Sequence, residues 1–177
     1  MDAVVLRSLQ APLKERYREA PEKALVQARA EAVLDPGPLV CRVTAAGRSV
    51  DAGLHPATGG DGSLACSADL LMQALAACAG VTLSAVATAM GIAIRNGRVV
   101  AEGEWDARGT LGVDRSVAVG LTEIRLRFEL DTNADAAALE RLVATTERYC
   151  VILQTLRVPP ILSVVMSRAL EATTGTR

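Results

Sequence analysis

The sequence is poor in aromatic and histidine side chains, and it carries no surplus of positive charge. Aromatic residues make up 2% of the chain, and 19 Lys and Arg stand against 20 Asp and Glu. A nucleic-acid-binding protein needs basic groups for the phosphates or aromatic rings for the bases, so we expect no nucleic-acid partner. With a single histidine, His55, the chain cannot build a metal site from several histidines, and we expect no metal or cofactor.

The cysteines are too few and too widely spaced for two common uses of this residue. None lies in a CxxC pair, which a zinc ribbon or thioredoxin-like motif requires, and the total is too low for the disulfide scaffold of a secreted protein. Residues 1–20 also lack the features of a signal peptide. We expect a cytoplasmic protein whose four cysteines are reduced thiols, namely Cys41, Cys66, Cys78 and Cys150.

One stretch, Leu70 to Ile94, contains no charged residue and is long enough to span a membrane. It is rich in alanine, however, and it includes Gln73 and several hydroxyl side chains. It also lacks the flanking aromatic residues of a membrane helix. We therefore interpret it as a buried helix of a soluble protein and expect no membrane association.

Half of the residues are hydrophobic, and a chain of 177 residues is about the size of one domain. We expect residues 1–20 to form a helical extension and residues 21–177 to form the domain. Alternating hydrophobicity predicts strands, and a spacing of three to four predicts helices. The expected strands are Leu25–Val33, Leu39–Thr44, Arg48–Leu54, Val99–Trp105, Ile124–Leu130 and Ile161–Met166, and the expected core helices are Ser67–Met90 and one that starts after Thr132.

This order of elements indicates an α+β fold with largely antiparallel strands. Ser67 is expected to cap the long helix and Gly91 to end it, while Thr132 is expected to cap the next helix. The later helix has an apolar stripe of Leu139, Val143, Thr146 and Cys150. The long helix has small residues every four positions, which fits either a core helix under a sheet or a helix packed on its own copy in a homodimer. These small residues are Ala76, Gly80, Ser84 and Thr88.

The residues that could carry chemistry are few. The glycine-rich loop GGDGS lacks the lysine of a phosphate-binding P-loop, and His55 has no hydrolase motif around it. Cys78 and Cys150 lie on the apolar faces of the two core helices. Each is either a small buried hydrophobe or, if the two helices meet, one half of a redox pair. Cys41 and Cys66 are interpreted as structural.

Two segments resemble the OsmC/Ohr family of osmotically induced and organic hydroperoxide resistance proteins. SADLLMQALAACAGVTL is similar to the family's helix around its first cysteine, and TTERYCVILQTL is similar to the segment around its second. The resemblance covers about Ala24 to Met166. It implies an antiparallel sheet wrapped on a long central helix, in an intertwined homodimer whose active sites draw on both chains.

The resemblance also implies a reaction. Cys78 matches the peroxidatic cysteine, which attacks an organic hydroperoxide and becomes a sulfenic acid. Cys150 matches the resolving cysteine, which closes a disulfide with it. A dithiol reductant, a lipoylated protein in some members, then reduces that disulfide.

The sequence departs from the hydroperoxidase branch at the groups that would activate Cys78. Ala68 stands where that branch has a glutamate, although Asp69 beside it and Glu147 before the second cysteine do match acidic positions of the wider family. The activating arginine has no clear match among Arg29, Arg42 and Arg48, and we take Arg42 as the candidate. These departures favour a general OsmC-like branch.

The leading hypothesis is therefore a thiol peroxidase for organic hydroperoxides that uses Cys78 and Cys150. The main alternative is a protein of the same fold that binds a small apolar ligand or senses redox state without efficient turnover. A third hypothesis is a cysteine hydrolase, which requires His55 within hydrogen-bonding reach of Cys78.

Overall fold

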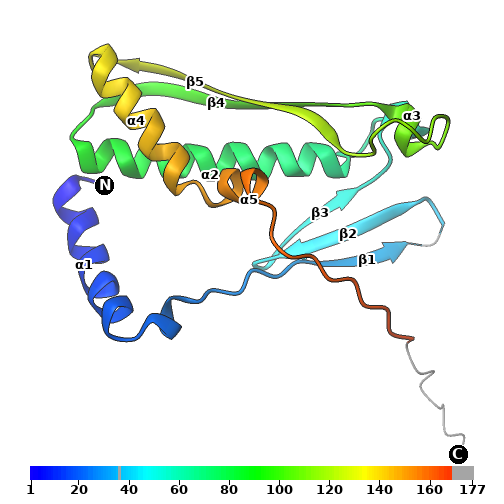
Figure 1. Ribbon diagram of the computed structural model, residues 1–177, viewed down its shortest axis with the longest axis horizontal. Helices are drawn as coiled ribbons and strands as arrows, with labels where there is room; N and C mark the ends of the chain where they lie inside the picture. The colour runs from blue at the N-terminus through cyan, green and yellow to red at the C-terminus, as the bar shows by residue number, and fades with distance from the viewer. Residues whose placement is uncertain (36, 169–177) are drawn as a thin grey trace, which may run out of the picture.

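The computed structural model describes residues 1–35 and 37–168 of the chain. Its strands and helices alternate in blocks along the chain (Figure 1). The strands are β1 (Glu31–Asp35), β2 (Val40–Ala45), β3 (Arg48–Ala52), β4 (Ile94–Trp105) and β5 (Leu121–Thr132). The helices are α1 (Ala3–Glu19), α2 (Ser67–Met90), α3 (Ala107–Thr110), α4 (Ala136–Tyr149) and α5 (Val151–Arg157), with short 3-10 turns at Pro21–Ala24 and Pro56–Thr58.

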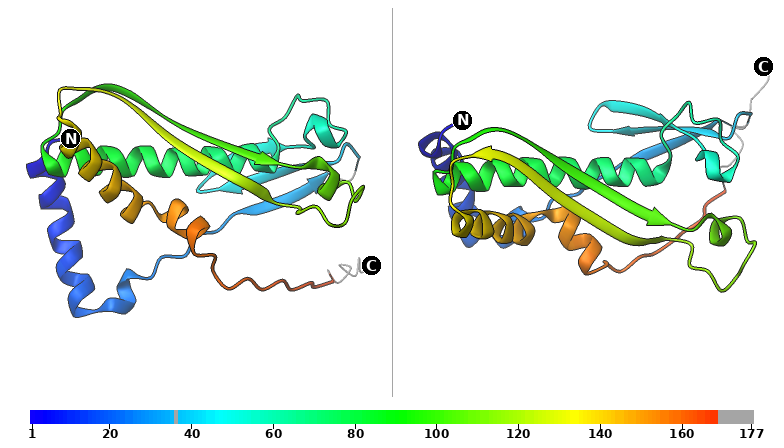
Figure 2. Two further views of the ribbon diagram at one scale, coloured as in Figure 1. Left: turned by 45° about the horizontal axis from the view of Figure 1, so that its top comes forward. Right: turned by 90° about the horizontal axis from the view of Figure 1, so that it is seen from above.

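The described strands form two antiparallel sheets, which confirms the α+β class. One sheet has the order β1-β2-β3, and the other is the long β4-β5 ribbon. The ribbon lies along α2 and crosses it at an angle, while α4 and α5 pack on α2 from another side (Figure 2). The β1-β2-β3 sheet projects beyond the N-terminal half of α2, and α1 descends from the other end of that helix (Figure 1).

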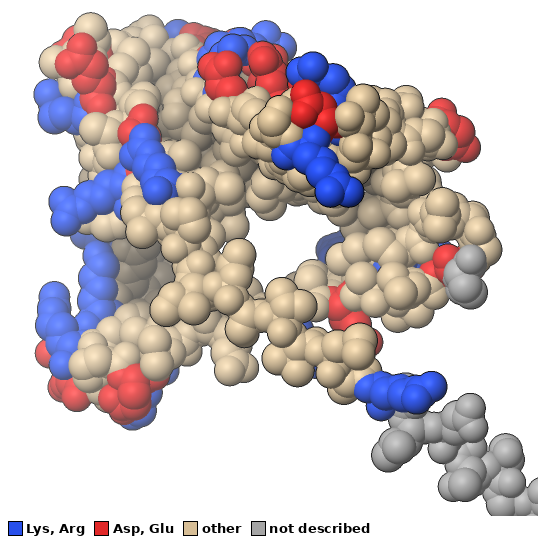
Figure 3. All heavy atoms as spheres, turned by 45° about the vertical axis from the view of Figure 1, so that its right-hand side comes forward, with Lys and Arg blue, Asp and Glu red and all other residues tan. Residues whose placement is uncertain are grey.

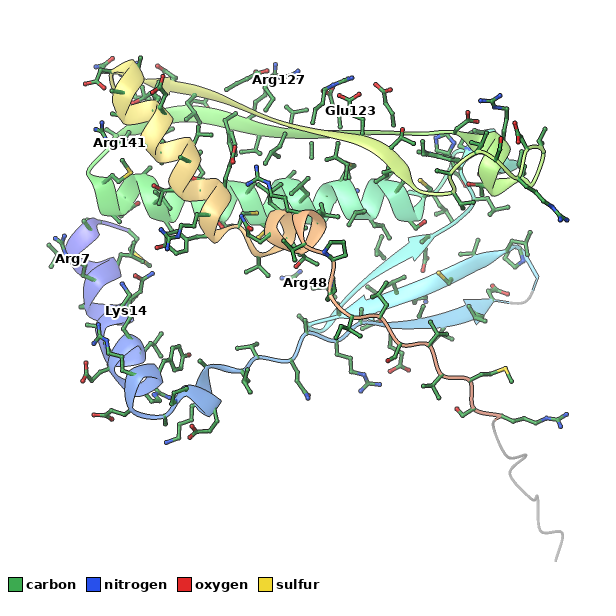
Figure 4. The ribbon with its side chains drawn as sticks, viewed as in Figure 1. Arg7, Lys14, Arg48, Glu123, Arg127 and Arg141 are labelled. Atoms are coloured by element: carbon green, nitrogen blue, oxygen red, sulfur yellow. The ribbon has the colours of Figure 1, made fainter. Side chains whose placement is uncertain are left out.

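The β4-β5 ribbon has one apolar and one charged face, as the alternation of its residues predicts. Val99 pairs with Phe128 and Ala101 pairs with Leu126, and all four pack against the core residues of α2. The opposite face carries ion pairs, and Figure 4 shows Glu123 and Arg127 pointing away from α2. Burial of the apolar face against α2 is what fixes the register of the two strands.

Helix α2 has the predicted limits, and its buried residues recur every four positions. Leu75, Ala79, Leu83 and Ala87 are at most 3% exposed and face the ribbon and α4. The helix ends at Gly91, whose φ of 69° lies in the left-handed region that glycine adopts without strain.

Both predicted N-caps are wrong by a few residues. Cys66 rather than Ser67 occupies the N-cap position of α2, and Asp69 accepts a hydrogen bond from the Cys66 N–H at 2.9 Å. Asp135 rather than Thr132 caps α4, because its carboxylate accepts the Ala138 N–H at 2.7 Å. Thr132 remains the last residue of β5. The Thr132 hydroxyl instead donates to the Ala93 carbonyl and accepts the Ala134 N–H, so it is not available to cap α4.

Two predicted strands are wrong or displaced. Residues 25–30 are extended but unpaired, so β1 begins only at Glu31. Ile161–Met166 forms no strand, and Ile161 and Val164 are about fully exposed. A strand needs a neighbour for its N–H and C=O groups, and within the described residues neither segment has one. The sequence also predicts a turn at residues 35–38, where Pro36 lies outside the described residues.

Candidate active site

The structure brings Cys78 and Cys150 together at the contact between α2 and the α4–α5 break. Cys78 lies midway along α2 and is partly exposed, whereas Cys150 lies between α4 and α5 and is 0% exposed. The two side chains are within hydrogen-bonding distance of each other, and both are free thiols. The structure thus places these two cysteines together at the helix contact, and their role as a redox pair stays a prediction.

The end of α4 and the start of α5 explain why two backbone amides reach Cys78. At Cys150 the backbone is extended (φ -74°, ψ 105°), so the chain leaves α4 and starts α5 in a new direction. The first N–H groups of a helix have no partner within the helix. Those of Val151 and Ile152 donate hydrogen bonds to the Cys78 sulfur instead.

The surroundings of Cys78 favour its thiolate. Burial raises the pKa of the Cys78 thiol, but four hydrogen bonds lower it, so the net pKa lies below its ordinary value. The donors are the Ile152 N–H, the Cys150 thiol, the Val151 N–H and the Thr82 hydroxyl. None of these groups is a cation, so within this chain only neutral donors lower the Cys78 pKa.

Cys150 is held in the opposite state. Burial raises the pKa of the Cys150 thiol, and its hydrogen bond to Cys78 and the negative charge of that thiolate raise it further. Hydrogen bonds from the Leu153 and Ile152 N–H groups oppose these effects without reversing them. The surroundings therefore favour the thiolate at Cys78 over the thiolate at Cys150.

Glu147 holds the α4–α5 break but does not touch Cys78. Its carboxylate binds Arg157 at 2.7 Å, and its backbone carbonyl accepts a hydrogen bond from the Gln154 side-chain amide at 2.6 Å. Gln154 thereby satisfies a carbonyl that the end of α4 leaves free. We call Glu147, Gln154 and Arg157 the break clamp, because two side chains of α5 attach to one residue of α4.

The other two supporting residues lie elsewhere within this chain. Asp69 is a helix cap, and the hydrogen bond from the Cys66 N–H lowers the pKa of its carboxyl. Arg42 lies on β2 and forms a bidentate pair with Asp51 on β3, at 2.7 and 2.9 Å. Neither residue is among the groups that bind Cys78. Within one chain Arg42 is therefore not bound to Cys78, and its activating role stays a prediction.

His55 is likewise separate from Cys78. It starts the turn Pro56–Thr58, its Nδ1 accepts the Ala57 N–H at 3.0 Å, and its ring packs edge-on against Trp105. It shares a cavity with Cys66 at the N-terminal end of α2, and the lining residue of that helix nearest to Cys78 is Leu71, about two helical turns away. The hydrolase hypothesis thus lacks the contact that it requires.

The comparisons with known proteins agree with this fold. A family model described as OsmC-like protein matches residues 60–164, which is more than half of the chain. The chain belongs to the OsmC-like family. None of the curated proteins matches the chain by sequence.

Several solved OsmC-like structures are similar to this chain. An OsmC-like protein from Mycoplasma pneumoniae is 19% identical, with a TM-score of 0.64 over 76% of this chain and 89% of that one. An organic hydroperoxide resistance protein from Elizabethkingia anophelis, with thiocyanate bound, is 17% identical, with a TM-score of 0.61 over 76% and 91%. An OsmC-like protein of unknown function from Vibrio cholerae is 11% identical, with a TM-score of 0.62 over 74% and 94%. At these identities the likeness shows the fold alone.

The family fold also decides how α2 is interpreted. Among the described helices α2 is the one long and apolar enough to cross a membrane, with a mean hydropathy of 1.9 over an 18-residue window. In the OsmC-like fold it is the core helix against which the ribbon, α4 and α5 pack. The interpretation of the uncharged run as a core helix agrees with this fold, and the cytoplasmic location remains a prediction.

Sequence reasoning missed the groups that contact Cys78. Thr82 could have been found, because it lies one helical turn after Cys78 on the same face of α2. Val151 and Ile152 could not, because they act through backbone N–H groups that any residue other than proline supplies. Gln154 and Arg157 reach Glu147 because the chain bends at Cys150, and no sequence pattern predicts that bend.

Proposed function

We propose that this protein is a thiol-dependent peroxidase that reduces organic hydroperoxides through Cys78 and Cys150. The observation that carries the proposal is the pair itself, two packed and hydrogen-bonded cysteines of which Cys78 has a lowered and Cys150 a raised pKa. Low-pKa thiolates that are partly accessible and lie next to a resolving cysteine are the usual sites of peroxide reduction.

In the first step the Cys78 thiolate attacks the distal oxygen of the hydroperoxide. A sulfur–oxygen bond forms, the oxygen–oxygen bond breaks, and an alkoxide leaves. The Cys150 thiol, already a hydrogen-bond donor to Cys78, is a suitable proton source for that alkoxide. The products are an alcohol, a sulfenic acid at Cys78 and a thiolate at Cys150.

In the second step the Cys150 thiolate attacks the sulfur of the Cys78 sulfenic acid. A disulfide forms and hydroxide leaves. Loss of the negative charge at Cys78 removes one cause of the raised Cys150 pKa, so the first step prepares the second. A dithiol then reduces the disulfide by exchange and returns both thiols, and a lipoylated protein is a reductant of this class.

We further propose that the working unit is a homodimer. In a single chain an opening runs between the β1-β2-β3 sheet, α2 and the segment after α5, and most atoms around it belong to uncharged residues (Figure 3). Several apolar residues after α5, such as Ile161, Leu162 and Val164, are at least 83% exposed. Apolar surface of this extent favours association, and a second copy would also bring another set of arginines near Cys78.

The decisive experiment adds one equivalent of an organic hydroperoxide to the reduced protein, followed by peptide mass spectrometry without reduction. We expect a rapidly formed Cys78–Cys150 disulfide. Cys78→Ser should abolish turnover, and Cys150→Ser should leave a sulfenic acid on Cys78 that a dimedone probe traps. Cys41→Ser serves as the matched control, because Cys41 lies on β2.

Two outcomes would count against the peroxidase. Thiols that stay unmodified under excess hydroperoxide would favour the ligand-binding or sensing alternative. Normal turnover in Cys78→Ser would assign the chemistry to another residue.

A further inference from the structure

A second cavity lies at the N-terminal end of α2, away from the thiol pair. It has a volume of about 480 Å³, and its walls come from the loop after β3, the first turn of α2, the end of β4 and the start of β5. Ala68 and Leu71 line it from α2, and Trp105 and Leu121 line it from the ribbon. This volume lies within the range of pockets that hold small organic molecules.

The lining carries no charge and is mostly apolar; besides His55, its polar side chains are Thr58, Ser67 and Thr110. None of the described residues around this cavity is Lys, Arg, Asp or Glu. By contrast, the groove beside α5 is lined by Glu123, Glu147 and Arg157. An ion would leave its hydration shell in the uncharged cavity without gaining a counter-charge, so an uncharged molecule fits it better.

His55 supplies a directional polar group to this lining. Its Nδ1 already accepts the Ala57 N–H at 3.0 Å, which in the neutral imidazole places the proton on Nε2. The ring is also held edge-on against Trp105, with centroids 5.4 Å apart. The group that His55 can offer a ligand is therefore an N–H donor.

The loop that carries His55 is fixed before any ligand arrives. The His55 carbonyl accepts hydrogen bonds from the Thr58 and Gly60 N–H groups, at 2.8 and 3.1 Å. A Cβ atom at Gly60 would lie 1.8 Å from the Leu54 carbonyl oxygen, so only glycine allows this close turn. A rigid loop loses little conformational entropy on binding, which favours affinity.

The cavity is separate from Cys78. Leu71 and Cys78 lie on the same face of α2, seven residues or about 10 Å apart. Leu75 lies between them and is 0% exposed, and neither Cys78 nor Cys150 lines the cavity. A molecule in this cavity would therefore leave the thiol pair free.

We propose that this cavity binds a small, uncharged, largely hydrocarbon molecule with one hydrogen-bond acceptor, held by the apolar walls and by the Nε2–H of His55. The proposal does not depend on peroxidase activity. Camphor and bornane are suitable probes, because they share one bicyclic skeleton and only camphor has a carbonyl oxygen.

The test is a titration of the intrinsic fluorescence of Trp105, the only tryptophan in the chain. We expect a saturable change with both probes, with camphor binding roughly three- to tenfold more tightly because of one hydrogen bond. His55→Phe keeps a ring against Trp105 but removes the donor, so it should abolish the preference for camphor and retain bornane binding. Ala68→Trp should fill the cavity, so the filled variant should take up neither probe when binding is measured by calorimetry.

Cys78→Ser should bind both probes as the natural protein does, which separates this site from the proposed peroxidase. A preference for camphor that persists in His55→Phe would overturn the role of His55. Absence of saturable binding in the natural protein would overturn the site as a whole. The same result is expected if a second copy of the chain fills the cavity, so that case also counts against the proposal.

Discussion

The two sulfur atoms of Cys78 and Cys150 differ because of their immediate neighbours. Both are partly or fully buried, and burial raises the pKa of each. Only Cys78 receives enough hydrogen bonds to reverse that effect. In the reaction proposed above, this difference in surroundings makes Cys78 the nucleophile and Cys150 the resolving thiol, since the two side chains are chemically identical.

The pH dependence of Cys78 alkylation tests this assignment. In the reduced protein, iodoacetamide should modify Cys78 with a half-maximal rate at a pH below that of free cysteine, because the thiolate is the reacting form. Cys150→Ala removes one hydrogen bond that lowers the Cys78 pKa, so the midpoint should move to higher pH. Cys150→Ser retains a donor and should shift it less. An unchanged midpoint in Cys150→Ala would contradict the pairing.

Thr146 offers a prediction about stability. Thr146 is 0% exposed. Among the described residues, its hydroxyl is the one buried side-chain group without a hydrogen-bond partner. Thr146→Val should raise the free energy of unfolding by about 1 kcal/mol, because an unpaired buried hydroxyl costs free energy that a methyl group does not. Urea denaturation at a fixed protein concentration measures it.

The neighbouring Thr145 is the matched control for Thr146. Its hydroxyl donates to the Arg141 carbonyl at 2.6 Å, so Thr145→Val should not stabilise the protein. If Thr146→Val instead lowered the stability, the hydroxyl would have a partner in the assembled protein.

At the scale of elements, the bend between α4 and α5 is the feature on which the thiol pair depends. A continuous helix would pair the N–H groups of Val151 and Ile152 within itself, and none would be left for Cys78. The break clamp joins the two helices on both sides of Cys150 through Glu147, Gln154 and Arg157. We infer that it keeps these amides directed at Cys78.

Loss of the clamp should therefore lower the reactivity of Cys78. In Arg157→Met combined with Gln154→Leu, the rate of Cys78 alkylation at neutral pH should fall by roughly three- to tenfold. The midpoint of the rate–pH profile should also move upward, an effect that a general loss of stability would not produce. Arg125→Met, which breaks exposed ion pairs on β5, is the control and should leave the profile unchanged.

At the scale of the whole molecule, the small residues of α2 are the place where a second copy could approach closely. Ala76, Gly80, Ser84 and Thr88 line an open groove between α2 and the ribbon. A Cβ atom at Gly80 would be 3.7 Å from Val99, an ordinary contact, so one chain tolerates a side chain there. Packing within one chain therefore does not require a side chain as small as that of glycine at position 80.

Gly80→Glu should convert the proposed homodimer into a monomer without unfolding it, because glutamate also favours a helix more than glycine does. Light scattering after size-exclusion chromatography should give twice 18.5 kDa for the natural protein and 18.5 kDa for the variant. Ala144→Glu, an exposed position on α4, should remain a dimer. A dimer that persists in Gly80→Glu would move the interface away from this stripe.

The sequence by itself determined the elements whose neighbours are close along the chain. The uncharged run and Gly91 predicted the limits of α2, and the alternation from Ile124 to Leu130 predicted the core of β5, because helix and strand periods are local properties. The class of fold followed from the order of these elements, and the resemblance to the family followed from the two segments that contain Cys78 and Cys150. The two cysteines were also found, since each lies in a recognisable segment of its own.

Only the tertiary structure decided what surrounds those cysteines. The bend at Cys150, the amides of Val151 and Ile152 at Cys78 and the pairing of Arg42 with Asp51 depend on contacts between elements. Ile161–Met166 has a strand pattern but no partner within the described residues, and pairing requires a neighbour that local sequence does not specify. Backbone donors carry no side-chain signature, so the groups that lower the Cys78 pKa become visible only once the helices are packed.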